Sequence, residues 1–262
     1  MVEGREYQHD FSEIHPKTMF DERGRLQKAR KTVAVILDAL QQAGIDSRET
    51  RLLDIGCSTG ILSRHYAEFF GNVVGIDIDD GAVEWARQNR VAENISYQIG
   101  DSLEIPFVSE EFDLVTCTHI YEHVPDAQRM LDEIHRVLRS GGYCFFAAEN
   151  RLRVWDGHYD LPFVTMLPRP LANVYVRLTG RGQRRYETHR TLWGLKRLVR
   201  AFEVTDYTGA VVRDPEKFEA TDMIRPGSRK QRIANAILSV APWAFPTYLW
   251  ILRKPEEVKS EE

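Results

Sequence analysis

The chain has 262 residues, of which 43% are hydrophobic, 28% charged and 10% aromatic, a composition typical of a folded globular protein that excludes a disordered or fibrous one. Its three cysteines, Cys57, Cys117 and Cys144, form no CxxC pair, so neither a disulfide framework nor a structural zinc site is predicted. This cysteine usage favours a reducing cytoplasm, and the first residues, MVEGREYQHDF, contain no apolar stretch, which predicts no secretory signal or transit peptide.

The net charge of −4 conceals a division along the chain. Residues 1–150 carry 15 basic and 26 acidic side chains, whereas residues 151–232 carry 17 basic and 9 acidic ones. A basic segment after an acidic one predicts either an anionic partner or packing of the second part on the first. A basic face that is simply solvated is the alternative.

Residues 26–43 show apolar side chains at three- and four-residue steps, which predicts an amphipathic helix. An apolar run at 51–55 then leads through a Gly/Ser/Thr turn into a helical pattern at 61–70. Further strands are expected at 72–79, 95–101, 112–120 and 143–150, with helices at 81–89 and 127–138. This alternation predicts an α/β, Rossmann-like, doubly wound sheet over residues 51–150.

The rhythm stops after residue 150. Residues 151–190 are rich in arginine, aromatic residues and Pro or Gly breakers, and they predict a cap inserted into the fold. Regular patterns return with a helix at 191–202, a strand at 202–212, a helix at 228–241 and a strand at 246–254. Residues 191–254 are therefore expected to complete the core sheet, one of these strands being a candidate antiparallel member, and residues 255–262 to form a frayed tail.

One apolar stretch, residues 233–252, is long enough to span a membrane and contains no charged residue. Three polar side chains and two prolines interrupt it, which favours a buried helix followed by a buried strand. Peripheral contact with a membrane stays open, because a basic cluster precedes the stretch and large aromatic residues lie within it. These residues are Arg229, Lys230, Arg232, Trp243, Phe245 and Trp250.

The turn from Asp54 to Gly60 follows a buried strand and opens a helix, which is where an open parallel sheet binds its ligand. Its glycine spacing is not GxGxxG, since Ser58 replaces a middle glycine, and a generic strand-to-helix turn is the alternative. Asp77 ends the next strand 17 residues beyond Gly60, near the distance at which nucleotide-binding folds place the acid that accepts the ribose hydroxyls. Asp79 is the weaker candidate for this role.

The third strand ends at Asp101 and Ser102, although Asp101 has an almost equal claim to be a turn cap. Several acids at successive strand ends, with few cations nearby, argue against a phosphate-rich ligand. They favour a nucleoside that carries a positive charge.

The segments LDIGCSTG, VVGIDID, IGDSLEIPF, FDLVTCTHIYEHVPD and LRSGGYCFFAAEN resemble the class I S-adenosylmethionine-dependent methyltransferases, in particular the type 11 group that acts on small molecules, lipids and glycans. The resemblance covers residues 26–150. It implies a seven-stranded, mostly parallel sheet with one antiparallel strand, covered at the cofactor site by a helical segment within residues 1–50. It also implies S-adenosyl-L-methionine as cofactor, with contacts from Asp54, Gly56, Cys57, Gly60, Asp77, Ile78, Asp101, Ser102, Thr118 and His119.

Methyl transfer requires alignment of the acceptor and, for a hydroxyl acceptor, removal of its proton. The candidate bases are His123, His158 and His119, in that order. The alternatives are that His123 caps a helix beginning at Val124, that His119 only packs on the cofactor, and that a neutral thiol or amine acceptor needs no base. No metal-ligand set is predicted.

The acceptor is expected to be a small molecule, a lipid or a glycan, and an anionic one. Nucleic acid is disfavoured, because the fourth strand is not followed by the Asn/Asp-Pro-Pro-aromatic loop that grips a flipped-out base. Tyr159, Arg181, Arg184 and Arg185 of the cap are the candidate substrate-binding residues, because guanidinium groups clamp anions. An NAD(P)-dependent dehydrogenase and a non-catalytic cofactor-binding module are the alternative functions.

Overall fold

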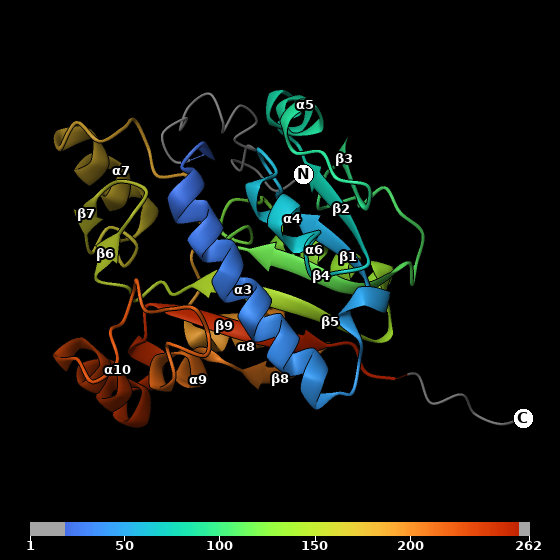
Figure 1. Ribbon diagram of the computed structural model, residues 1–262. Coiled ribbons are helices and arrows are strands. Elements are labelled where there is room, and N and C mark those ends of the chain that lie inside the picture. The colour runs from blue at the N-terminus through green and yellow to red at the C-terminus, as the bar shows by residue number, and fades with distance from the viewer. Residues whose placement is uncertain (1–18, 257–262) are drawn as a thin grey trace, which may run out of the picture.

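The computed structural model describes residues 19–256, so the outermost parts of the expected N-terminal segment and of the expected tail lie outside the described residues. Its centre is a seven-stranded sheet in the order β3-β2-β1-β4-β5-β9-β8 (Figure 1). The strands are β1 (Arg51–Ile55), β2 (Asn72–Asp77), β3 (Ile95–Ile99), β4 (Phe112–Thr118), β5 (Leu138–Glu149), β8 (Glu203–Asp206) and β9 (Thr247–Arg253).

Strands β1 to β5 pair in parallel, whereas β9 is antiparallel to both β5 and β8. Every strand expected from the sequence is present, and the expectation of a mostly parallel sheet with one antiparallel strand is confirmed. The parallel order brings the carboxyl ends of β1, β2, β3, β4 and β5 to one edge of the sheet.

Helices cover both faces of this sheet. One core packs α3 (Glu22–Gln42), α4 (Ile61–Tyr66) and α9 (Thr208–Arg213) against one face, and a second packs α6 (Ala127–Val137) and α8 (Leu192–Leu198) against the other. The remaining helical elements are α5 (Asp80–Asn89), which packs near β3, α10 (Arg229–Val240), and the short 3-10 turns η1 (Ser47–Glu49) and η2 (Pro242–Ala244).

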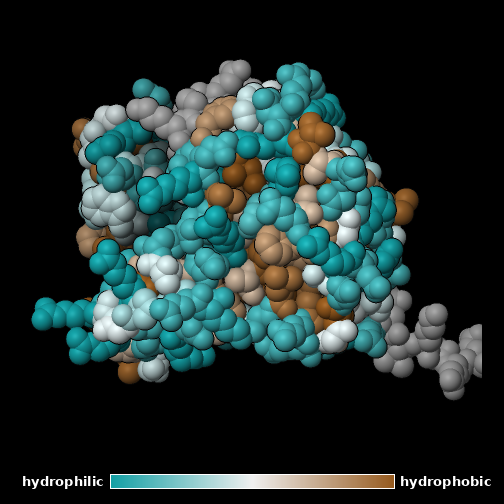
Figure 2. All heavy atoms as spheres, viewed as in Figure 1, coloured by the Kyte–Doolittle hydropathy of each residue, from teal (hydrophilic) through white to brown (hydrophobic). Residues whose placement is uncertain are grey.

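The sequence explains where these helices begin. Helix α6 starts at Ala127, because the Asp126 side chain accepts hydrogen bonds from two backbone N–H groups of the first turn. Met130, Leu131 and Ile134 then line its buried face at the spacing that predicted the helix. Figure 2 shows hydrophilic side chains over most of the viewed face, which includes the outer side of α3.

The expected strand at 202–212 is wrong in its second half. Strand β8 ends at Asp206, whose side chain accepts a hydrogen bond from the backbone N–H of Thr208, and helix α9 begins there. Tyr207 and Val211 are four residues apart and both pack into the core under α3. The β-branched valines suggested a strand, but their burial follows the helical period.

The cap lies between β5 and α8. It contains a hairpin of β6 (Trp155–Asp156) and β7 (Leu161–Pro162), followed by α7 (Arg169–Leu178). A small core of its own includes Tyr159, Leu161 and Val164. Figure 1 places the cap beyond the carboxyl ends of β4 and β5, beside the start of α3.

The apolar stretch at 233–252 does not form one helix. It divides into the end of α10, the turn η2 and strand β9, and within residues 19–256 no helix is long and apolar enough to cross a bilayer. Strand β9 is buried as expected, with Trp250 only 1% exposed. Helix α10 is not buried, because Ala234 is its one buried residue.

Candidate active site

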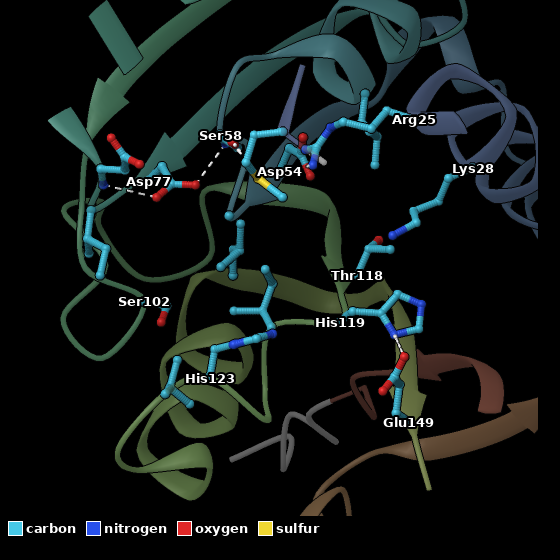
Figure 3. A pocket seen from close by; sticks show the side chains of 18 of the residues that line it. Arg25, Lys28, Asp54, Ser58, Asp77, Ser102, Thr118, His119, His123 and Glu149 are labelled. Carbon is cyan, nitrogen blue, oxygen red and sulfur yellow. Dashed lines mark hydrogen bonds and ion pairs between the residues drawn. The ribbon is translucent and has the colours of Figure 1, made fainter. Parts of the chain in front are cut away.

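A cavity of about 450 Å³ opens at the carboxyl ends of the parallel strands (Figure 3). This volume lies within the range of small-molecule sites. The loops after β1, β2, β3 and β4, the end of β5, the start of α3 and the β6–β7 turn of the cap all contribute to its lining. The cavity is therefore closed by segments from both the core and the cap.

The loop after β1 is a tight turn that requires left-handed backbone at three positions. Gly56 and Gly60 have φ values of 73° and 70°, and Ser58 has 49°. The first two need glycine because a Cβ strains this conformation. The backbone N–H of Ser58 donates a 2.7 Å hydrogen bond to Asp77, so the loop and the acid ending β2 fix each other.

Asp77 faces the cavity with both oxygens held by the backbone. Its second oxygen accepts a 3.0 Å bond from the N–H of Asp79. Burial raises the pKa of Asp77, and these N–H groups oppose the increase. A carboxylate has about four acceptor positions, so two remain for hydroxyl groups of a ligand.

Asp54, at the end of β1, is buried under the same loop. The hydroxyls of Ser63 and Thr116 donate to its two oxygens at 2.5 and 2.7 Å. Burial raises the pKa of Asp54 to about 6, despite these two bonds and the positive charge of Arg25.

Two cationic side chains of α3 reach into the cavity, although no sequence motif had indicated them. Arg25 and Lys28 extend from the first turns of this helix, and Figure 3 shows Lys28 directed toward Thr118. Burial, and then the charge of Arg25, lower the pKa of Lys28 to about 8. Their one sequence signal was the basic side of an amphipathic helix, which does not reveal what that side faces.

His119 lies at the end of β4 in left-handed backbone, with a φ of 58°. Its Nδ1 is 3.7 Å from Glu122 Oε1 and 4.0 Å from Glu149 Oε1 (Figure 3). Within residues 19–256 neither oxygen of the buried Glu122 has a hydrogen-bond partner. Burial lowers the pKa of His119, which favours a neutral imidazole. Burial opposes ionisation of Glu122, but the contacts with His119 and His123 lower its pKa overall.

His123 and His158 also line the cavity, one from the loop after β4 and one from the cap. Their ring centroids are 5.1 Å apart. The alternative that His123 caps a helix at Val124 is wrong, because α6 begins at Ala127 and Asp126 caps it.

Glu149 reaches the same cavity from the end of β5, although sequence reasoning did not select it. Its side chain accepts a 3.1 Å bond from His189 Nε2, which belongs to the chain between α7 and α8. The acid ends a predicted strand, as Asp77 does, and this position was the one signal that could have identified it.

Most of the cofactor candidates meet at the cavity: Asp54, Gly56, Asp77, Ile78, Ser102, Thr118 and His119. Three do not line it. Cys57 is buried beside Gly75 and Tyr97, and Gly60 is the N-cap of α4. Asp101 is the third.

Two of the acids at strand ends have local roles as caps. Asp101 accepts a 2.8 Å hydrogen bond from the N–H of Leu103, so it caps the turn after β3, as the alternative interpretation predicted. Asp79 lines the cavity and also caps α5, because it accepts a bond from the N–H of Ala82.

The four candidate substrate-binding residues stay within the cap, and none of them lines the cavity. Arg185 is buried and donates to two backbone oxygens of the cap. The Tyr159 hydroxyl donates to the carbonyl of Arg184, and Arg181 pairs with Asp160. These contacts stabilise the cap itself.

Comparison with known proteins identifies the domain that carries most of this site. Residues 53–146 match a family model described as a methyltransferase domain. The ubiquinone biosynthesis O-methyltransferase of Coxiella burnetii is 34% identical over 102 residues, which cover 38% of this chain and 44% of that protein. The enzyme of the same name from Hydrogenovibrio crunogenus is 31% identical over 137 residues, 51% of this chain and 56% of that protein. The chain thus spans about half the length of these curated relatives.

Solved structures agree on the fold. An S-adenosylmethionine-dependent methyltransferase from Mesorhizobium loti superposes with a TM-score of 0.53 at 20% identity, over 82% of this chain and 96% of that one. The glycine turn after β1 and the acid that ends β2 lie within the matched residues 53–146. Residues 53–146 therefore match a methyltransferase domain, and the chain has the fold of known S-adenosylmethionine-dependent methyltransferases.

Proposed function

We propose that this protein transfers a methyl group from S-adenosylmethionine to a hydroxyl oxygen of a small, partly apolar acceptor. The observation that carries the proposal is Asp77, held at the floor of a 450 Å³ cavity by the backbone of the glycine turn. The curated relatives are named as O-methyltransferases of ubiquinone biosynthesis, which supports oxygen as the methylated atom and a lipid-like acceptor.

The cavity fits the parts of this cofactor. Asp77 would accept the two ribose hydroxyls, and Ser102 lies at the end of β3 where the adenine would be held. Arg25 would pair with the carboxylate of the methionine moiety, since its side chain lines the cavity on the side of Asp54 (Figure 3). The bound cofactor supplies an already activated methyl group, so the protein must mainly align the acceptor and exclude water.

His119 is the base that the geometry favours among the three histidine candidates. Its Nδ1 faces the carboxylates of Glu122 and Glu149, which leaves Nε2 to accept the hydroxyl proton of an acceptor. A buried carboxylate that orients an imidazole and stabilises its protonated form is the arrangement of known acid–base catalysts. Left-handed backbone at a non-glycine residue is common at such sites.

The acceptor would occupy the side of the cavity nearest the cap. Ile120 and Val124 line the cavity together with polar His158 and Lys28, which suits a hydroxylated molecule with an apolar portion. The methyltransferase domain favours this reaction over nicotinamide-dependent hydride transfer. An anionic acceptor held by the arginines of the cap stays a prediction. It has no support from the cavity, because those side chains do not line it.

We also propose that the protein docks on anionic membranes, from which a lipid-like acceptor would be taken. Leu171, Val174 and Leu178 form an apolar stripe on α7 and are 58%, 44% and 82% exposed. Arg169 and Arg177 belong to the same helix, so its exposed side combines apolar and basic groups. In Figure 1, α7 and α10 lie at the same end of the molecule, which would let both face one membrane.

Calorimetry with S-adenosylmethionine and its demethylated product tests the proposed function. We expect Asp77→Ala to weaken binding of both by about 1–3 kcal/mol, because the ribose hydroxyls lose their acceptor. Asp80→Ala is the matched control, since this exposed acid is in the first turn of α5 and does not line the cavity.

Unchanged affinity in Asp77→Ala would contradict the assignment of this acid. Wild-type protein would then be incubated with an isotopically labelled methyl donor and extracts of metabolites, lipids and glycans. Label in a hydroxylated lipid supports the proposed acceptor. Cofactor binding without transfer to any extract would instead support a non-catalytic module.

A further inference from the structure

We propose that His123, His158 and Glu187 form a binding site for a divalent transition-metal ion, such as Zn²⁺, at the junction of core and cap. The three side chains come from separate segments: the loop after β4, the β6–β7 turn and the chain between α7 and α8. They lie far apart in the sequence, which is why no ligand pattern was visible there.

The geometry is close to that of a metal centre. One potential ligand atom from each residue can be chosen so that all three lie within 4.8 Å of one another. In a tetrahedral zinc site with bonds of about 2.1 Å, ligand atoms are separated by ~3.4 Å, so small side-chain rotations would close the site. Two imidazoles and one carboxylate are a common ligand set for zinc and for non-haem iron.

The burial of Glu187 gives an independent reason to expect a cation. This residue is 3% exposed, and within residues 19–256 its Oε2 has no hydrogen-bond partner. A buried carboxylate oxygen without a partner is costly. The Nδ1 atom of His158 is likewise buried without a hydrogen bond, 3.6 Å from Asp156 Oδ1.

Two neighbouring groups of possible ligands are less suitable. In the first, formed by Glu149, Asp156, His158 and His189, Arg153 already pairs with Glu149 and the Arg185 guanidinium is 3.4 Å from His189 Nδ1. These guanidinium groups already engage Glu149 and His189, two of the side chains that would have to bind the ion.

The second group, formed by His119, Glu122 and Glu149, shares the ion-paired Glu149 and contains the proposed base. The described residues therefore favour the group that contains Glu187.

The proposed ion would have a distinct role from that of the cofactor. His123 and His158 both line the cavity, so the open coordination positions would face the side where the acceptor is expected. Three protein ligands with an open position are typical of metal sites that bind a water or substrate oxygen. The ion would also hold the cap hairpin to the loop after β4. Metal binding itself does not depend on the proposed methyl transfer.

Titration of chelator-treated protein with Zn²⁺, followed by calorimetry, tests this site. We expect one ion per chain, and a loss of affinity of at least about tenfold in Glu187→Gln and in His158→Gln, because each removes a ligand. His65→Gln is the control, since this histidine is on α4 and pairs with Glu68 outside the cavity. Circular dichroism checks that each variant is folded.

The outcomes separate this proposal from the proposed function. Binding of S-adenosylhomocysteine by the same variants would show that the cofactor site is intact while zinc is lost. Failure of folded wild-type protein to bind Zn²⁺ would overturn the metal site and leave the methyltransferase proposal standing. Unchanged zinc affinity in Glu187→Gln would also overturn it, and a loss in His158→Gln and His189→Gln without a loss in Glu187→Gln would assign the ion to the Glu149 group, which shares His158.

Discussion

Asp54 and Asp77 end neighbouring strands, but different groups donate hydrogen bonds to their carboxylates. Asp77 is held by backbone N–H groups and keeps acceptor positions toward the cavity, whereas both oxygens of Asp54 accept bonds from hydroxyl groups. Hydroxyls can donate to a carboxylate or accept from a neutral group, because they rotate. Asp54 can therefore change its protonation state without losing its neighbours.

This property predicts an effect of pH on stability. The pKa of Asp54 is about 6 in the folded protein and about 3.9 in an unfolded chain, so above pH 6 the buried charge opposes folding. Between these values the folded state holds a proton that the unfolded state has lost, and lowering the pH through this window relieves the cost. We expect cofactor-free Asp54→Asn to be about 2 kcal/mol more stable than wild type at pH 7, with a smaller difference at pH 5.

Urea unfolding at the two pH values measures this difference. Asp132→Asn, an exposed position on α6, should show no such pH dependence. An equal difference at both pH values would mean that Asp54 does not carry a buried charge. So would an Asp54→Asn variant that is less stable than the wild type at pH 7.

Replacement of His119 tests its proposed role as the base. We expect His119→Gln to lower the single-turnover rate by about 10²–10⁴-fold while cofactor affinity stays within about twofold. Because burial lowers the pKa of His119, the wild-type rate should fall only when the pH drops below the usual range for histidine, and the variant should lose this decrease. Full activity in His119→Gln would point to His123, to His158 or to an acceptor that needs no base.

The spacing of apolar residues in the sequence predicted a helix or strand correctly where the buried residues follow a single helical or strand period along the whole element. Helix α6 illustrates this, since its apolar residues all face the sheet. The segment 202–212 does not, because β8 is entirely exposed while α9 packs into the core. A strand on the edge of a sheet carries a weaker pattern than the helix that follows it, so the boundary at Asp206 was missed.

Helix α7 allows a test of membrane docking. Changing Leu171, Val174 and Leu178 together to Ser should weaken binding to vesicles that contain phosphatidylglycerol by about tenfold or more, because apolar area leaves the interface. Sedimentation with vesicles measures the bound fraction, and neutral phosphatidylcholine vesicles should bind the wild type less. The triple change of Ile233, Val240 and Trp243 to Ser serves as the comparison on the α10 side.

Equal binding by the α7 variant and the wild type would contradict docking through α7. If only the α10 variant lost binding, the membrane surface would instead be the segment that the apolar run of the sequence indicated. Cofactor affinity, measured on both variants, shows that the core fold is retained.

In the folded molecule, the cavity is lined by segments that lie far apart in the sequence. The core supplies the floor through the ends of β1, β2 and β4, and the cap hairpin supplies His158. Helix α3 supplies the cations Arg25 and Lys28 (Figure 3). Of the arginines that were expected to reach an acceptor, Arg185 lies instead in the interior of the cap at 6% exposure, whereas Arg181 and Arg184 are exposed. Cap and core meet through buried polar groups, among them the 3.1 Å contact between His189 and Glu149.

The order of strands and turns along the chain was enough to predict the parallel sheet and the meeting of the Asp54–Gly60 turn with Asp77, and the family resemblance added Ser102 and Thr118 to the same cavity. Right-handed crossovers bring the carboxyl ends of parallel strands to one edge, so residues that end strands must meet. The approach of Arg25, Lys28, Glu149 and Glu187 to the same region became visible only in the folded molecule. The charge and composition of a segment do not show which way its side chains point. The packing of α3 and the cap against the sheet brings Arg25, Lys28 and Glu187 to this region, whereas Glu149 reaches it from the end of β5.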